Sequence, residues 1–390
     1  MVEHIDIRPE MLSWAIERTG QDVNVFLATH EDVSDWMSGV RKPTTKQLES
    51  FAGKMHVPFG YLFLPIPPQE EIPFPVFRGC AGQGPFSLNV YDTVMEVSQR
   101  QQWLEEYLPA NELPLPSFIG SVSLQEGISH AVSELRRILH IEPRWAFTLH
   151  SPEQAVNKLT EMIEDAGVFV AFNGVVGNNT HRPIDVDECR GFALTSEIAP
   201  FIYINSQDAK TAQLFTLMHE MAHLLIGVSA GHAGDYELSL DFTERFCDSV
   251  AAEFLVPREI LINEWSEINT CAKKFKVSQL VVARRAHDLG LLSDMAYHDF
   301  YQSYRARPIT AKKTSVGGDF YATSKKRVGR LFAIHVNNAV NSRQLSRTEA
   351  YRMTGVYKSP ANAGAKELCQ KGLDAYAREA LSLNRNAFNA

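Results

Sequence analysis

The chain has 390 residues, of which 45% are hydrophobic and 22% are charged. These proportions are those of an ordinary soluble globular protein, and the length leaves room for two or three domains. The sequence contains no run of 18 apolar residues that could cross a membrane, and its first residues do not resemble a secretory signal. We therefore expect a cytoplasmic protein with no membrane partner. The five cysteines form no CxxC pair, which favours reduced thiols.

The net charge of −8 is unevenly distributed along the chain. Residues 305–371 contain fourteen Lys or Arg and only three Asp or Glu, so this part is basic and the remainder is acidic. Such asymmetry indicates contact with nucleic acid or with an acidic protein through the C-terminal part. A solvated basic surface that offsets an acidic remainder explains the pattern equally well.

Residues 1–68 are predicted to form a domain of short helices. Apolar side chains recur at helical spacing in residues 9–18, 33–37 and 44–55, and Thr44 can cap the last of these helices. The pattern therefore predicts a small helical bundle at this end of the chain.

Parts of this bundle, residues 12–15, 36–44 and 57–63, resemble the helix-turn-helix domain of Xre-type phage repressors. The resemblance implies DNA binding. The turn and recognition helix at 21–38, however, carry four acidic residues and no Lys or Arg. Because DNA phosphates attract a basic surface, this domain is equally well interpreted as a protein-contact module.

A proline-rich linker is predicted at residues 69–78, because five prolines lie between positions 65 and 75. Beyond it, capping patterns and helical periodicity predict helices, and short β-branched or aromatic runs predict strands. The helices are expected at 90–108, 123–139 and 151–166, and the strands at 168–172, 191–195 and 201–205. Such strands would form a small mixed sheet, and its exposed edge could hold an extended peptide as an added strand. The sequence does not identify the edge strand.

The stretch 214–226 predicts a buried helix that carries metal-binding groups. It is apolar nearly all round, yet it contains His219, Glu220 and His223. Two histidines four residues apart project from one face of a helix and can bind one cation, and the neighbouring glutamate can take a proton from water on that cation. This is the HExxH pattern of zinc hydrolases.

A third ligand is expected on a second helix, at residues 244–257. Glu244 and Asp248 lie one turn apart beside its apolar stripe, so the first can bind zinc while the second accepts the outer N–H of a ligating histidine. HExxH followed by ExxxD resembles the gluzincin class of metallopeptidases. His232 is the alternative third ligand, although nine residues after His223 is not the spacing of metzincin sites.

Three further helices are expected in the C-terminal part, at 277–289, 325–340 and 346–355. Residues 345–356 look like the first half of a small helix-turn-helix. Together with the basic composition, this makes the C-terminal part the better candidate for DNA contact.

Residues 201–205, 214–225 and 244–257 together resemble the ImmA/IrrE family of metallopeptidases. The resemblance implies a zinc endopeptidase that cleaves an Xre-type repressor and so relieves repression of stress, DNA-damage or mobile-element genes. Cys247 and Asp248 stand where Ala-Asn is usual in the family. Aspartate can orient an imidazole as well as asparagine can, so the change is compatible with activity.

The expected fold is α+β: a mostly helical, zincin-like catalytic domain with a small mixed sheet, flanked by an N-terminal helical helix-turn-helix-like domain and a C-terminal helical region. The expected domains are the helix-turn-helix-like domain at 1–68, the linker at 69–78, the zinc metallopeptidase domain with its helical lead-in at 79–298, and the basic helical region at 299–390. No oligomeric state is predicted.

Two other classes of function fit parts of the sequence. One is a DNA-binding regulator or antitoxin that retains an inactive peptidase fold, and the other is a scaffold whose acidic N-terminal domain captures a repressor or toxin. A complete set of metal ligands argues against the inactive fold, because buried ligands without a metal are costly to retain.

Overall fold

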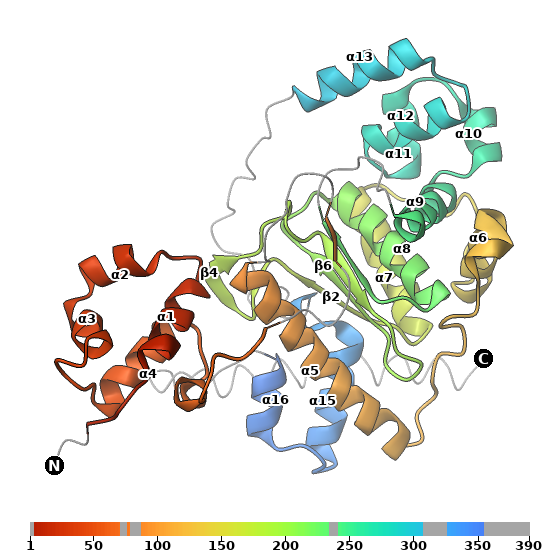
Figure 1. Cartoon of the computed structure of the whole chain (residues 1–390). Helices are drawn as coiled ribbons and strands as arrows, with labels where there is room; N and C mark the ends of the chain where they lie inside the picture. Colours follow the sequence, from red (N-terminus) through yellow and green to blue (C-terminus); the bar gives the residue numbers. More distant parts are fainter. Residues whose placement is uncertain (1–3, 71–75, 79–86, 234–240, 307–325, 355–390) are drawn as a thin grey trace. The chain divides into compact units, whose positions relative to one another are not determined.

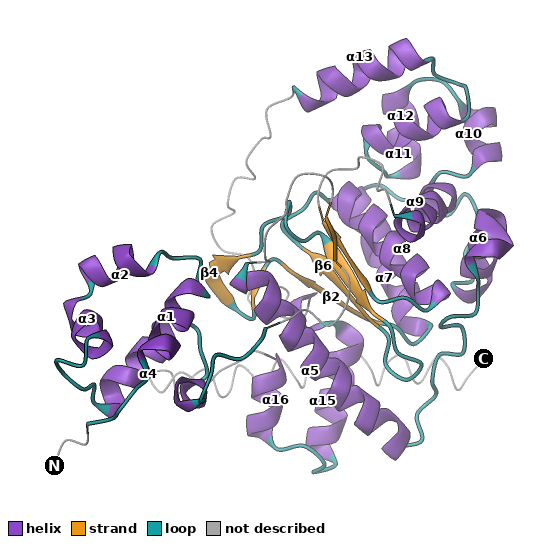
Figure 2. Ribbon diagram, viewed as in Figure 1, coloured by secondary structure: helices purple, strands orange, loops and turns teal. Residues whose placement is uncertain are grey.

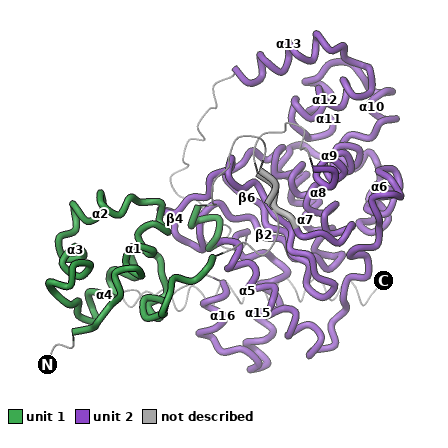
Figure 3. Tube along the Cα trace, viewed as in Figure 1, with its two compact units in different colours: residues 1–73, 84–92 green, residues 74–83, 93–390 purple. Residues whose placement is uncertain are grey.

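The computed structural model describes residues 4–70, 76–78, 87–233, 241–306 and 326–354, with backbone alone for 76–78 and 230–233. The chain divides into two compact units, one of residues 1–73 and 84–92 and one of residues 74–83 and 93–390 (Figure 3). Among the described residues, no helix is both long and apolar enough to cross a membrane.

The first unit is a bundle of short helices around one apolar core. Its elements are α1 (Pro9–Glu17), α2 (Val23–Thr29), α3 (Glu31–Met37), α4 (Thr45–Lys54) and the 3-10 helix η1 (Phe59–Phe63). The predicted helices are confirmed, and Thr44 and Gln47 form a capping box at the start of α4. Helix α2 was not predicted, because Val23, Val25 and Thr29 are β-branched and disfavour helix.

A mixed five-stranded sheet lies at the centre of the second unit (Figure 2). Its strands are β1 (Val76–Arg78), β2 (Phe169–Asn173), β5 (Gly191–Leu194), β6 (Phe201–Asn205) and β7 (Ala230–Ala233), in the order β1-β7-β5-β6-β2. β5 pairs antiparallel with both β6 and β7, whereas β2–β6 and β1–β7 are parallel pairs. A hairpin of β3 (Val175–Val176) and β4 (Asn179–Pro183) forms a second small sheet.

The remaining described helices belong to the second unit (Figure 1). They are α5 (Leu88–Ala110), which begins in the first unit, and then η2 (Leu124–Glu126), α6 (Gly127–Ile138), α7 (Pro152–Asp165), α8 (Lys210–Ile226), α9 (Phe242–Leu255), α10 (Arg258–Glu264), α11 (Ile268–Phe275), α12 (Gln279–Asp288), α13 (Asp294–Arg305), α15 (Arg330–Asn341) and α16 (Arg347–Thr354). The predicted α+β class, mostly helical with a small mixed sheet, is confirmed.

Both faces of β2 and β6 are buried, so these strands are apolar without alternation. Val170, Ile202 and Ile204 belong to the same apolar core as α8. On the other face, the ring of Phe201 meets that of Phe332 from α15 at 6.4 Å between centroids. Because successive side chains of a strand alternate between faces, one apolar run serves both layers.

The β2 edge of the sheet is closed by α15. Gly329, just before this helix, lies so close to the carbonyl of Val170 that a Cβ at that position would collide with it. Buried Glu164 of α7 accepts hydrogen bonds from Arg330 Nε at 2.8 Å and from Leu331 N at 3.0 Å. Part of the basic C-terminal sequence is therefore used inside the second unit. The predicted domain limit at residue 298 stays a prediction, and Gly355 lies outside the described residues.

Candidate metal and peptidase site

Helix α8 places the HExxH residues in the core. Every side chain from Ala212 to Leu225 is buried, and His219, Glu220 and His223 are 0% exposed. The helix ends at Gly227, whose φ of 75° is the left-handed conformation that favours glycine at this position. Burying three polar groups in an apolar layer is costly unless they have partners, so the arrangement needs a compensating interaction.

Helix α9 supplies that interaction. It begins at Asp241, whose carboxylate accepts hydrogen bonds from Thr243 N at 2.8 Å and Glu244 N at 3.2 Å. This cap starts the helix so that Glu244 lies on the side packed against α8, and its carboxylate is buried there. Asp241 was not among the predicted site residues, although an aspartate directly before an apolar helix is a signal for such a cap.

The ligand atoms of three side chains converge between the two helices. Nε2 of His219 and Nε2 of His223 are 3.1 Å apart. The two carboxylate oxygens of Glu244 lie 3.2 Å from His219 Nε2 and 3.0 Å from His223 Nε2. Of the residues that the structure describes, these three form the one group of histidine, cysteine or acidic side chains placed to hold a metal ion.

The spacing and chemistry of this group fit a divalent metal ion. Tetrahedral ligands at about 2.0–2.1 Å from a zinc ion would be about 3.3 Å from one another, close to the observed separations. Two imidazole nitrogens and a carboxylate oxygen are a donor set that suits such an ion. The structure thus brings together the three predicted ligands, His219, His223 and Glu244.

Asp248 lies one turn further along α9 and contacts the far side of the first histidine. Its Oδ1 is 2.9 Å from Nδ1 of His219, which leaves Nε2 of that ring facing the cluster. Burial lowers the pKa of His219, but its hydrogen bonds to Asp248 and Glu244 and their negative charges outweigh burial and raise the pKa well above its usual value. The predicted contact of Asp248 with a candidate ligand is present.

The side chain of Glu220 is fully buried, as are those of the two histidines. Both of its carboxylate oxygens are buried, and neither has a hydrogen-bond partner among the described residues. Burial raises the pKa of Glu220 well above its usual value; the charge of His219 opposes this and those of Glu244 and Asp248 add to it. A carboxyl group in this environment is suited to taking up and releasing a proton.

His232 lies on β7, where its backbone is in register with Gly191 of β5 and Phe77 of β1. Its side chain is outside the described part of the structure. The alternative in which His232 is the third ligand stays a prediction, and Glu244 completes a three-ligand group without it.

Two arginines fix the far end of α9. Arg136 donates from Nη2 to the carbonyl of Phe254 at 2.8 Å, and Arg285 donates from Nε to that of Val256 at 3.3 Å. Cationic groups at a helix C-terminus bind its free carbonyls. Together with the Asp241 cap, they hold both ends of the helix that carries Glu244 and Asp248.

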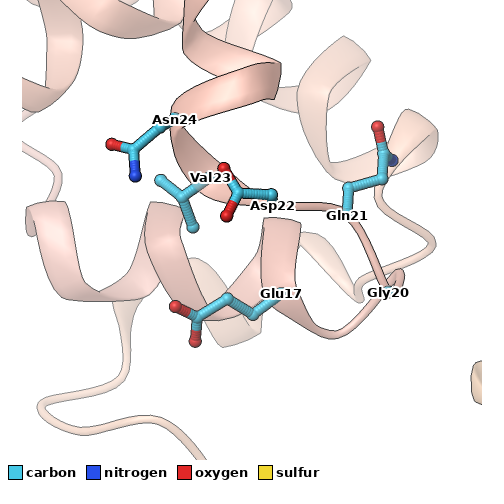
Figure 4. Close-up of a pocket in the computed structure, with 6 residues that line it drawn as sticks. All are labelled: Glu17, Gly20, Gln21, Asp22, Val23 and Asn24. Carbon is cyan, nitrogen blue, oxygen red and sulfur yellow. The ribbon is translucent and has the colours of Figure 1, made fainter.

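The first unit has an open hollow of about 430 Å³ where α1 turns into α2 (Figure 4). Its lining residues are Glu17, Gly20, Gln21, Asp22, Val23 and Asn24. It contains none of the predicted site residues and no group of metal ligands among those described, so the chemistry of the chain points to the α8–α9 cluster.

Comparison with protein families points to the same segment of the chain as the candidate site. Residues 163–287, which run from the end of α7 to α12 and include the whole cluster, match a peptidase family model described as the IrrE N-terminal-like domain. Residues 328–360 match a model described as a domain of unknown function, DUF8813. A search of curated proteins found no match. The resemblance inferred from the sequence is confirmed over the first of these segments.

Proposed function

We propose that this chain, which carries a peptidase domain of the ImmA/IrrE type at residues 163–287, is a zinc-dependent endopeptidase. The observation that carries the proposal is the buried convergence of His219, His223 and Glu244 beside Glu220. Structural packing alone does not account for two imidazoles and two carboxylates gathered in an apolar core, because each is costly to bury without a compensating charge.

The residues present define the chemical roles. A zinc ion bound by His219, His223 and Glu244 would supply a Lewis acid and a water of lowered pKa. Glu220 takes the proton of the water that attacks the peptide carbonyl and then gives it to the leaving amine. Asp248 holds His219 in the tautomer and orientation that direct Nε2 to the metal position.

We further propose that the substrate is a helix-turn-helix repressor of the Xre type, which would place the enzyme in the cytoplasm and make stress or mobile-element genes its targets. The resemblance to the ImmA/IrrE family and the repressor-like sequence of the first unit support this. DNA contact by the basic C-terminal part is a weaker proposal, because Arg330 pairs with Glu164, and Lys326 pairs with Glu153.

The test is cleavage of a repressor encoded beside the gene for this protein. Zinc-loaded full-length chain should cut it, and a chelator or Glu220→Gln should reduce cleavage at least about a hundredfold. Glu220→Gln should still bind one zinc ion per chain, since the carboxyl group is not a ligand. Glu259→Gln, on the exposed face of α10, is the matched control and should cleave normally. Undiminished cleavage by Glu220→Gln would overturn the mechanism.

A further inference from the structure

The β7 edge of the sheet runs alongside the stretch of α8 that carries the site. At one end of β7, Val228 N donates to the carbonyl of His223 at 3.0 Å, and Thr195 N donates to Ser229 Oγ at 2.8 Å. At the other end, His232 is in register with Gly191, and a Cβ on Gly191 would lie 2.7 Å from Thr216 Cγ2. Because Thr216 is one turn before His219, β7 spans the level of both histidines.

This edge is occupied by a strand from a distant part of the same chain. Residues 76–78 form β1, which pairs parallel with β7 in the register Val76 to Gly231, Phe77 to His232 and Arg78 to Ala233. Figure 1 shows this short red strand beside the green strands of the sheet. Among the described strands, β1 is the outermost on this side.

The described strand is short, and the residues next to it in the sequence have little strand preference. Pro75 precedes it and cannot donate a ladder hydrogen bond, and Gly79 follows it and disfavours a longer strand. A three-residue strand makes only a few ladder bonds, each with a net value of about 1 kcal/mol. Such a strand can be displaced by a longer extended peptide without disturbing the core.

The strand is also covalently joined to the rest of the chain on both sides. Glu70, before β1, and Asp92, after it, both bind the buried side chain of Arg18, at 2.6 Å and 3.0 Å. The residues that flank this segment in the sequence therefore lie together in the first unit. Tethering of this kind gives a segment a local concentration on the order of millimolar, so weak pairing is enough to occupy a site.

We propose that the edge along β7 is the surface on which the extended backbone of the substrate pairs, and that residues 76–78 occupy it until substrate displaces them. This inference rests on the proposed peptidase function and adds a way to regulate it. Residues 76–78, from the segment that joins the two units in the sequence, would compete with the substrate for the same edge. A free sheet edge beside a peptidase site binds substrate through main-chain hydrogen bonds, which any strand of suitable length can supply.

The first test measures whether pairing with β1 protects the backbone amides of β7. Phe77→Pro removes a backbone N–H from β1, whereas the matched variant Phe77→Val keeps it and favours strand. Amide hydrogen exchange at residues 230–233 of the full-length, zinc-loaded chain should be at least tenfold faster in Phe77→Pro than in Phe77→Val. Equal exchange would overturn the proposal, because the edge would then not depend on β1.

The second test measures competition. In repressor cleavage, Phe77→Pro should raise kcat/KM about three- to tenfold through a lower KM with unchanged kcat, while Phe77→Val stays within twofold of the parent chain. Faster exchange with unchanged or lower kcat/KM would show that β1 is a structural strand and not a competitor.

A third measurement separates this proposal from the peptidase function. A fluorescent peptide of residues 73–82, carrying Cys80→Ser, should bind Phe77→Pro at least tenfold more tightly than Phe77→Val in fluorescence anisotropy. If no variant cleaves the repressor but the peptide binds in this order, the peptidase proposal fails and the self-occupied edge stands. If the peptide binds neither variant, the edge proposal fails whatever the cleavage result.

Discussion

The two edges of the sheet in the second unit are held in very different ways. At the β2 edge, a five-residue buried strand is covered by α15, with Gly329 against Val170 and Glu164 bound to Arg330. At the other edge, β7 has four residues and β1 three. The candidate metal ligands belong to the buried interior, and the edge formed by the shorter strands runs beside them. In the proposed function, this division would let one domain hold the ligands in fixed geometry while a neighbouring strand exchanges with substrate.

The largest effect is expected where the β2 edge is most tightly packed. Gly329→Ala would place a Cβ against the carbonyl of Val170 at a φ of +90°, so we expect a loss of about 4 kcal/mol in the free energy of unfolding. Gly290→Ala is the matched control, because Gly290 has a φ of +72° but open space around it, and should cost about 1 kcal/mol. Urea denaturation measures both. Equal losses would mean that the contact with Val170 does not close this edge.

A smaller effect is expected from His335, which packs in the same layer between Tyr107 and Phe169. Burial lowers its pKa to about 4. In the unfolded chain, a histidine has a pKa of about 6.5, so between about pH 6.5 and about pH 4 the unfolded chain binds more protons than the folded one. The free energy of unfolding therefore falls as the pH falls through this range, by up to about 3 kcal/mol. His335→Leu should lose this part of the pH dependence in denaturation curves. If the free energy of unfolding depends on pH in the same way in His335→Leu and in the parent chain, the prediction is wrong.

The contact between Asp248 and His219 should contribute less free energy than the packing at the β2 edge, and its loss should lower the affinity for zinc. Asp248→Ala is expected to weaken zinc binding about 10- to 100-fold, because the ring of His219 loses its orienting partner. Asp248→Asn keeps an acceptor and should recover most of the affinity. Competition with a chromophoric chelator measures both, with Ser249→Ala as the control from the same helix. Unchanged affinity in Asp248→Ala would show that packing alone positions the histidine.

The smallest effect is expected at the β1 edge. Phe77→Pro should lower the free energy of unfolding by only about 1 kcal/mol, since the few bonds of β1 contribute little to the core. Thermal unfolding of Phe77→Pro and Phe77→Val measures the difference. A large loss in Phe77→Pro would remove the contrast between the two edges and make β1 part of the folded core.

The positions of the candidate ligands followed from helical spacing. His219 and His223 share a face because they are four residues apart, and Glu244 and Asp248 do so for the same reason. The strands at 169–173, 191–194 and 201–205 were recognisable because they are continuous apolar runs. β7 was not, since its sequence Ala-Gly-His-Ala has little strand preference and its pairing comes from β5.

Sequence by itself determined which groups could bind a metal, because ligand type and helical period are local properties of the chain. Tertiary structure decided that Glu244 reaches the two histidines, since that depends on the packing of α9 against α8 and on the Asp241 cap. It also decided which strands form the edges. Pairing of residues 76–78 with 231–233 joins segments far apart in the chain, and short strands gain their stability from such partners and not from their own residues.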